Sequence, residues 1–304
     1  MKTRIDVISG FLGAGKTTLI LKLLENPPPD CRIAVVENEY GEVGIDGDVL
    51  KDRGVEVAEV NAGCVCCTLS GNLIAGIKLL VARYRPDRIL LEPTGLANLW
   101  EVLNILKDED VLKLAEIGAA AAVLDSSVLL RIYEPYQRYF DAQIGSASAV
   151  FLNRTDGLDD EARLGVYELI RRINPRARVL AEPVSAEDAW QALNQPYDPP
   201  EQPWQGLPKA WLQSFKQVAV DTAWPGSRER LQEFLRPGQP FGAVIRAKGH
   251  VYDGEGARWR MDLSGGALSF EPAPQGGEDR VQLIGRNLPV NMVRRFFDEG
   301  REQA

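Results

Sequence analysis

The feature that most constrains this chain is the segment GFLGAGKT at residues 10–17. A β-prone apolar run at residues 5–9 precedes it, and residues 18–24 after it have the apolar spacing of a helix. Glycines between a strand and a helix let the backbone turn its N–H groups inward, and the helix start adds the positive end of its dipole. This pattern indicates a loop that binds the phosphates of a nucleotide; the alternative is a chance glycine turn before a helix.

The loop supplies reactive side chains as well as shape. The ammonium group of Lys16 can reach the β- and γ-phosphates, and the hydroxyl of Thr17 can ligate Mg²⁺, so both are predicted to serve catalysis. The residues expected to contact the nucleotide in this segment are Gly10, Gly13, Ala14, Gly15, Lys16, Thr17 and Thr18.

The composition is that expected of a two-domain cytoplasmic protein. The chain has 304 residues and a hydrophobic fraction of 45%, which is ordinary for a protein with a buried core. A net charge of −8 argues against a nucleic-acid partner. No apolar run has membrane-spanning length, and the N-terminus lacks the pattern of a signal peptide.

Strand-like apolar runs alternate with helical patterns from residue 1 to about residue 195. This alternation predicts an α/β domain with a mostly parallel sheet that helices cover on both faces. The expected strands are residues 4–9, 32–37, 55–60, 88–91, 119–124, 149–152 and 178–181. Helical patterns include residues 70–84, 98–107 and 159–173.

A proline-rich stretch at residues 196–208 then breaks the alternation. Because proline cannot continue a helix or a central strand, this stretch is predicted to be a semi-rigid linker. Residues 209–304 are predicted to form a smaller α+β domain with an antiparallel sheet. Its expected strands are residues 214–222, 241–252, 257–263, 267–271 and 280–284, and its expected helices are residues 227–235 and 289–299.

A second motif, Glu-Pro-Thr-Gly at residues 92–95, directly follows an apolar strand. In nucleotide-binding loops of this kind the acid holds Mg²⁺ through water, and the glycine N–H senses the γ-phosphate. Glu92 and Gly95 are predicted to have these roles. The alternative for Glu92 is a surface carboxylate that closes a strand.

A third motif, Asn-Arg-Thr-Asp at residues 153–156, resembles the guanine-specificity pattern N-K-x-D. The carboxylate of Asp156 would accept hydrogen bonds from N1 and N2 of guanine, and Asn153 would bind the phosphate loop or the base. Arg154 replaces the usual lysine, but its stem and planar head can still lie over the base. The alternative is a turn in which Asp156 caps the next helix. Backbone N–H groups around Ser185 are expected to add a further guanine contact.

The most specific chemistry lies in Gly-Cys-Val-Cys-Cys at residues 63–67. Cys64, Cys66 and Cys67 can converge on one soft divalent ion as thiolates, leaving one tetrahedral position open. A disulfide scaffold would spread its cysteines out, and the fourth cysteine, Cys31, is remote. The alternatives are buried apolar cysteines or a redox pair.

Together these motifs resemble the CobW-type family of P-loop metal-chaperone GTPases. The phosphate loop, residues 37–46, residues 61–67 and residues 92–95 fall in that family's order, and residues 246–252 resemble a core strand of its second domain. The resemblance spans most of the chain. It implies that residues 37–46 form a switch near Mg²⁺ and the γ-phosphate, and that zinc is the usual metal, with cobalt or iron in some branches.

The acids of the switch are candidates for positioning water, holding Mg²⁺ or completing the metal site. Glu39 and Asp46 are assigned to catalysis and Glu37 and Glu42 to metal binding, although each stays open to the other roles. The chain departs from many members in lacking a histidine-rich tract, since His250 is its only histidine. His250 is expected to be a half-buried strand residue rather than a ligand.

The sequence therefore predicts a two-domain GTPase that binds GTP or GDP with Mg²⁺. It is expected to bind Zn²⁺, with Co²⁺ or Fe²⁺ as alternatives, and to deliver the metal to a client metalloprotein. Whether it is a monomer or a homodimer stays open. The competing hypotheses are a metal-binding regulatory adaptor with vestigial GTPase activity and a P-loop kinase of small molecules.

Overall fold

A computed structural model of the chain falls into two compact units, Met1–Pro208 and Lys209–Ala304, and each is described by itself. The structure describes residues 2–37, 56–59, 69–195, 197, 204, 211, 214–221, 228–235, 243–253, 256–264, 267–274, 276 and 279–302. Of the predicted linker, only Tyr197 and Trp204 are among them. The indole of Trp204 lies so close to Gly145 that a Cβ added to that glycine would be 2.1 Å from the ring.

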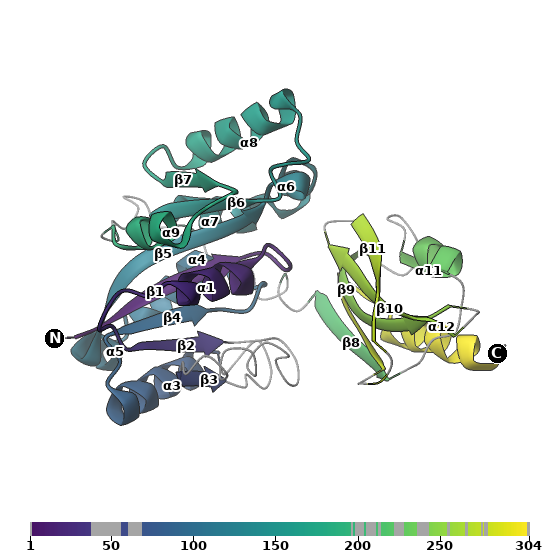
Figure 1. Cartoon of the computed structure of the whole chain (residues 1–304), viewed down its shortest axis with the longest axis horizontal. Coiled ribbons are helices and arrows are strands. Elements are labelled where there is room, and N and C mark those ends of the chain that lie inside the picture. The colour runs from purple at the N-terminus through teal and green to yellow at the C-terminus, as the bar shows by residue number, and fades with distance from the viewer. Residues whose placement is uncertain are drawn as a thin grey trace. The chain divides into compact units, whose positions relative to one another are not determined.

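The first unit is built on a seven-stranded sheet with the order β3-β2-β4-β1-β5-β6-β7 (Figure 1). Each pair of neighbouring strands is parallel, which confirms the predicted α/β fold. The strands are β1 Thr3–Gly10, β2 Ile33–Glu37, β3 Glu56–Glu59, β4 Arg88–Glu92, β5 Ala115–Asp125, β6 Ala149–Asn153 and β7 Arg178–Ala181. In a parallel sheet all carboxyl ends meet at one edge, and this edge collects the motifs that follow the strands.

Helices cover both faces of this sheet (Figure 1). Leu23 of α1 and Trp190 of α9 belong to one core cluster with the sheet, while α4 and α7 pack against each other on the opposite face. The helices are α1 Lys16–Glu25, α3 Leu69–Tyr84, α4 Leu99–Leu106, α5 Glu109–Leu114, α6 Ser126–Tyr133, α7 Gln137–Gly145, α8 Asp160–Ile173 and α9 Ala186–Leu193, with a 3₁₀ turn, η1, at Glu134–Tyr136.

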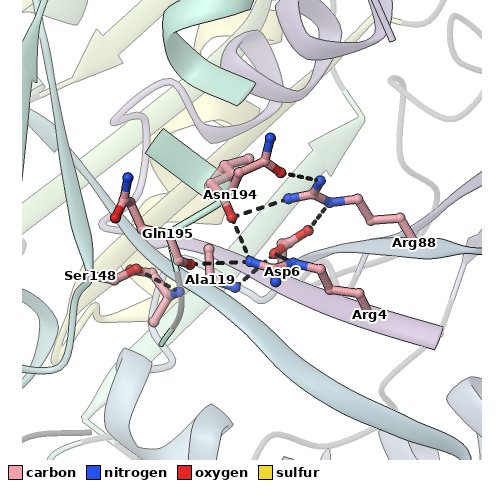
Figure 2. Close-up of polar contacts among 9 residues, drawn as sticks. Arg4, Asp6, Arg88, Ala119, Ser148, Asn194 and Gln195 are labelled. Carbon is pink, nitrogen blue, oxygen red and sulfur yellow. Dashed lines mark hydrogen bonds and ion pairs between the residues drawn. The ribbon is translucent and has the colours of Figure 1, made fainter. Parts of the chain in front are cut away.

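The central strand β1 carries an acid, Asp6, whose side chain is completely buried (Figure 2). Its carboxylate accepts a hydrogen bond from the backbone N–H of Ala119 at 2.7 Å and pairs with the guanidinium groups of Arg4 and Arg88. A Cβ at residue 118 would lie 2.3 Å from the Asp6 carboxylate, so only glycine leaves room for the carboxylate there. This cluster joins the amino-terminal halves of β1, β4 and β5.

The same two arginines fasten the end of α9 to the sheet (Figure 2). Arg4 donates to the carbonyl of Leu193 at 2.7 Å, and Arg88 donates to the side-chain oxygen of Asn194 at 2.8 Å. The Arg88 guanidinium also lies 4.7 Å from the ring centre of Trp190 on α9. Cationic groups at a helix C-terminus donate hydrogen bonds to its free carbonyls and interact favourably with the negative end of its dipole.

The second unit is a five-stranded sheet with the order β11-β10-β9-β12-β8, in which each neighbouring pair is antiparallel. Apolar residues alternate along these strands and pack with Leu231 of α11 and Phe297 of α12. His250 lies half-buried on β9, as expected. The elements are β8 Phe215–Asp221, α11 Arg228–Leu235, β9 Ala243–Tyr252, β10 Arg258–Ser264, β11 Ala267–Pro272, β12 Arg280–Arg286 and α12 Val290–Glu302.

Candidate functional site

The glycine-rich loop connects β1 to α1 at the carboxyl edge of the sheet. Gly10 is the last residue of β1 and Lys16 the first of α1. Gly13 and Gly15 have φ angles of 74° and 96°, in the left-handed region that favours glycine. Thr18 lies exposed on the first turn of α1. The loop thus has the strand–turn–helix geometry that lets backbone N–H groups and a helix N-terminus face an anion.

Thr17 and Glu92 come together although 75 residues separate them. The Thr17 hydroxyl donates to the two carboxylate oxygens of Glu92 at 3.1 and 3.0 Å. Nζ of Lys16 lies 3.8 Å from Glu92 Oε1, and both side chains are largely buried. A hydroxyl and a carboxylate in contact are hard oxygen donors of the kind that Mg²⁺ prefers, so these residues fit a magnesium ion.

Gly95 lies directly against the phosphate loop. A Cβ at this residue would be 2.9 Å from the backbone nitrogen of Leu12. The phenol of the buried Tyr139 donates to the Gly95 carbonyl at 3.1 Å. Burial raises the pKa of Tyr139, so the phenol stays protonated and keeps this donor. The segment that follows β4 is therefore held against the glycine-rich loop.

Asn153 connects the third motif to the phosphate loop. Its side-chain nitrogen donates to the carbonyl of Ala14 at 2.7 Å. A Cβ on Gly15 would lie 2.2 Å from that same nitrogen, so a side chain at residue 15 would displace it. Asn153 was expected to bind either the phosphate loop or the base, and in the structure it binds the phosphate loop.

Arg154 makes a contact that the sequence did not predict. Its guanidinium forms an ion pair with Asp125 at the end of β5. The expected packing of its stem and planar head over the base stays a prediction. The residue has a φ of 57°, and its backbone N–H donates to the carboxylate of Glu182 at 2.7 Å. Asp125 and Glu182 were not predicted, although Asp125 closes an apolar strand as Glu92 does, and that signal is present in the sequence.

The alternative role for Asp156 was to cap the next helix, and the structure gives that role to another residue. The cap of α8 is Asp159, whose carboxylate accepts from the backbone N–H of Ala162 at 2.8 Å. Asp156 itself is exposed beside the same edge of the sheet. Ser185 caps α9, and its hydroxyl bonds the backbone N–H and the carboxylate of Asp188. The Ser185 side chain therefore caps the helix, and the expected contact of the backbone N–H groups here with guanine stays a prediction.

The predicted cysteine ligands and most of the switch acids lie outside the described residues. This applies to Cys64, Cys66 and Cys67 and to the switch acids Glu39, Glu42 and Asp46. Glu37 ends β2, where it is the register partner of Glu92 on β4 and of Glu59 on β3. Within the part of the chain that the structure describes, no group of three or more histidines, cysteines or acids could hold a metal. Burial raises the pKa of the Cys31 thiol, which disfavours a thiolate there.

Comparison with known proteins identifies the first unit. The sequence profile of the CobW/HypB/UreG nucleotide-binding domain matches residues 4–181. The zinc chaperone YeiR of Escherichia coli K12 is 37% identical over 160 residues, which are 53% of this chain and 49% of that protein. The zinc chaperone CobW of Sinorhizobium is 32% identical over 216 residues, or 62% of this chain and 61% of that protein. The chain thus spans about half to three-fifths of the length of these relatives.

Two further similarities extend the comparison. The zinc-regulated GTPase metalloprotein activator 1 of Schizosaccharomyces pombe is 32% identical over 184 residues, which are 58% of this chain and 44% of that protein. A crystal structure of a Zn(II)-bound triple mutant of YjiA GTPase covers 98% of this chain and 99% of its own at 20% identity, with a TM-score of 0.50, and this likeness shows the fold. Among the described residues, no helix is both long enough and apolar enough to cross a bilayer.

Proposed function

The chain belongs to the CobW/HypB/UreG nucleotide-binding family, and on this premise we propose that it is a GTP-hydrolysing metallochaperone that delivers zinc to a client metalloprotein. The observation that carries the proposal is the contact of Thr17 with Glu92 beside Lys16, because it assembles the catalytic groups of a phosphate loop. The names of the curated relatives, zinc chaperones and zinc-regulated GTPases, support the choice of nucleotide and metal.

At the nucleotide end, the protein acts mainly by positioning. Lys16 binds the β- and γ-phosphates, and the backbone N–H groups of residues 13–18 surround them. Thr17 and Glu92 would hold Mg²⁺, which would supply positive charge beside the phosphates. Water is the nucleophile, and a switch acid such as Glu39 or Asp46 orients it. Since no arginine finger is assigned, the intrinsic rate is slow.

At the metal end, we propose that Cys64, Cys66 and Cys67 bind the zinc cargo as thiolates. Three ligands leave one tetrahedral position for Glu42, Glu37 or a group of the client. A site that is not closed by four protein ligands suits a metal that must be handed over. Water or a client ligand can then enter without the loss of a protein ligand.

The order of the strands supports coupling between the two ends. β3, β2 and β4 are neighbours, and Glu59, Glu37 and Glu92 are register partners at their carboxyl ends. The switch follows β2 in the chain and the cysteine motif follows β3. Both segments therefore begin at adjacent points of the sheet, next to the strand that ends in Glu92. We propose that GTP orders the switch and tightens metal binding, and that GTP hydrolysis weakens metal binding and so favours transfer of the metal to the client.

A metal titration in different nucleotide states tests this function. We expect one thiolate-bound metal per chain, with an affinity about 5–150-fold higher with a non-hydrolysable GTP analogue than with GDP, and a reciprocal effect of metal on nucleotide affinity. Cobalt should give thiolate charge-transfer absorption that disappears when Cys66 and Cys67 are replaced by serine. Cys31→Ser is the control and should keep the spectrum. Equal metal affinities in the two states would remove the switch, and a spectrum that survives the double change would place the metal elsewhere.

We further expect Asp156→Asn to weaken the preference for GTP over ATP. Asp156 would accept hydrogen bonds from N1–H and the exocyclic amine of guanine, a pair of donors that adenine does not present. Competition between the two nucleotides in wild type and variant measures the effect. A wild-type protein that binds ATP and GTP equally well would remove the basis for a guanine-specific activity.

A measurement of GTP turnover and of released phosphate separates the competing functions. A regulatory adaptor would bind metal without GTP turnover. A small-molecule kinase would transfer the γ-phosphate to an acceptor rather than to water, so free phosphate would not accumulate.

A further inference from the structure

We propose that Asp125 and Glu182 are positioning residues for guanine recognition: they fix the conformation of Arg154 and thereby aim Asp156 at the base. This inference deepens the proposed function and rests on it. We call residues 153–156 the base loop. The sequence motif places base recognition in this loop, but the contacts that hold its shape come from the ends of two other strands.

The first anchor is the ion pair of Arg154 with Asp125. The Asp125 side chain is only 8% exposed, whereas that of Arg154 is 49% exposed. One Asp125 oxygen accepts from the backbone N–H and the hydroxyl of Ser127 at 3.1 and 2.6 Å, as the cap of α6. The other oxygen pairs with the Arg154 guanidinium. A buried carboxylate needs such partners, so the pair draws Arg154 toward β5.

The second anchor is Glu182, which follows β7. Its carboxylate accepts the backbone N–H of Arg154 at 2.7 Å, and its backbone carbonyl accepts the hydroxyl of Thr155 at 3.1 Å. Arg154 has a φ of 57°, a left-handed conformation that is unfavourable for a residue with a side chain. Such a conformation persists only where the surroundings hold it, and here the two carboxylates do so.

The side chains around the base loop are not completely packed. A cavity of about 50 Å³ borders the loop, with Thr155, Glu182 and the buried Ser126 in its lining. On the other side, Asn153 holds the loop to Ala14 of the phosphate loop at 2.7 Å. Polar contacts therefore determine the path of the chain into Asp156.

These contacts affect the base and the phosphates differently. Phosphate contacts would come from the glycine-rich loop and α1, whereas the contacts of Asp125 and Glu182 given above are with Arg154 and Thr155 of the base loop. The two hydrogen bonds that a carboxylate accepts from N1–H and the exocyclic amine of guanine tolerate little error in distance or angle. Loss of an anchor should therefore weaken discrimination between bases, while turnover at saturating nucleotide changes much less.

Asp125→Asn is the decisive variant, because asparagine is also a good helix cap and nearly the same size, so the cap of α6 can persist while the charge and the acceptor that faces Arg154 are lost. GDP and IDP share every phosphate contact but differ by the 2-amino group that Asp156 would bind. We expect the preference for GDP over IDP, measured by calorimetric titration, to fall about tenfold. This factor corresponds to the lower end of the free-energy range for a hydrogen bond to a charged group. For GTP hydrolysis, KM should rise far more than kcat falls.

Matched variants separate positioning from general damage. Asp159→Asn changes the cap of the next helix, where the carboxylate accepts from the backbone N–H of Ala162, and should keep the GDP-to-IDP preference. Arg154→Gln should act like Asp125→Asn, and the double variant should be no worse than either, since both remove one interaction. Arg154→Lys keeps the charge and should retain most of the preference. If Asp125→Asn fails to fold, the half-exposed Arg154→Gln variant carries the test.

The outcomes distinguish this inference from the proposed function. Loss of the GDP preference in Asp156→Asn but not in Asp125→Asn or Arg154→Gln would overturn the positioning role and leave guanine recognition intact. An equal loss of GDP and IDP binding in Asp125→Asn would also overturn it, because the effect would not involve the base. An unchanged preference in Asp156→Asn would overturn both.

Discussion

Replacing Lys16 with alanine is expected to lower GTP turnover by at least about a hundredfold, the scale of losing one pre-organised electrostatic contact at a transferring group. Lys16 is the first residue of α1, and its ammonium lies 3.8 Å from Glu92 at the predicted phosphate site. Alanine is a good helix former, so the helix should persist. Thr17→Ala should have a comparable effect, because it removes the hydroxyl that contacts Glu92.

Steady-state phosphate release, with unfolding curves for each variant, measures this effect. Lys78→Ala is the matched control: Lys78 is an exposed lysine of α3 that pairs with Asp110. It should turn over GTP like the wild type. Unchanged turnover in Lys16→Ala would mean that the glycine-rich loop is not the working site.

The phosphate loop could be predicted from the sequence because its determinants are local. The glycines, the preceding apolar strand and the following helical pattern lie within residues 5–24, and φ angles of 74° and 96° at Gly13 and Gly15 follow from their having no Cβ. The strands were predicted for a similar reason. Strands buried on both faces appear as continuous apolar runs between turn residues.

The contacts around Arg154 could not be predicted in this way. Asp125 and Glu182 lie 29 and 28 residues from Arg154 along the chain, and they meet it only because β5, β6 and β7 are neighbours in the sheet. The motif N-R-T-D specifies a type of loop, but the partner of its arginine depends on strand order. The roles of the switch acids and of Cys64, Cys66 and Cys67 stay predictions.

The start of β5 is a second feature that could not be predicted from the sequence. The apolar run begins at residue 119, but the strand begins at Ala115, because Ala115, Glu116 and Ile117 pair in register with β1, and Gly118 lies at the register shift that follows. A glutamate and a glycine in this stretch argue against a core strand. The Asp6 cluster explains the glycine, since Gly118 leaves room for the Asp6 carboxylate.

The Asp6 cluster leads to the largest stability effect that we expect. Asp6→Ala should lower the free energy of unfolding of the first unit by about 3–5 kcal/mol, the range for removing one partner of a buried ion pair. The change leaves the buried guanidinium of Arg88 without its carboxylate and removes the acceptor of the Ala119 N–H. Asp6→Asn keeps that acceptor but not the charge, so its effect should be smaller.

Hydrogen exchange at increasing urea, read on peptides of β1 and β5, reports the unfolding of the first unit separately. Asp87→Ala is the control, because it breaks an ion pair with Arg32 whose two partners are both exposed, and it should change the unfolding curve far less. A further variant, Asp6→Leu with Arg88→Met, replaces this pair with apolar groups and should recover part of the loss, since no buried guanidinium is then left at residue 88 without its carboxylate. If Asp6→Ala were no worse than Asp87→Ala, the buried ion pairs of Asp6 would contribute no more to the stability of the first unit than an exposed pair does. The attachment of α9 would then rest on the direct bonds of Arg4 and Arg88 to its end and on the packing of Trp190.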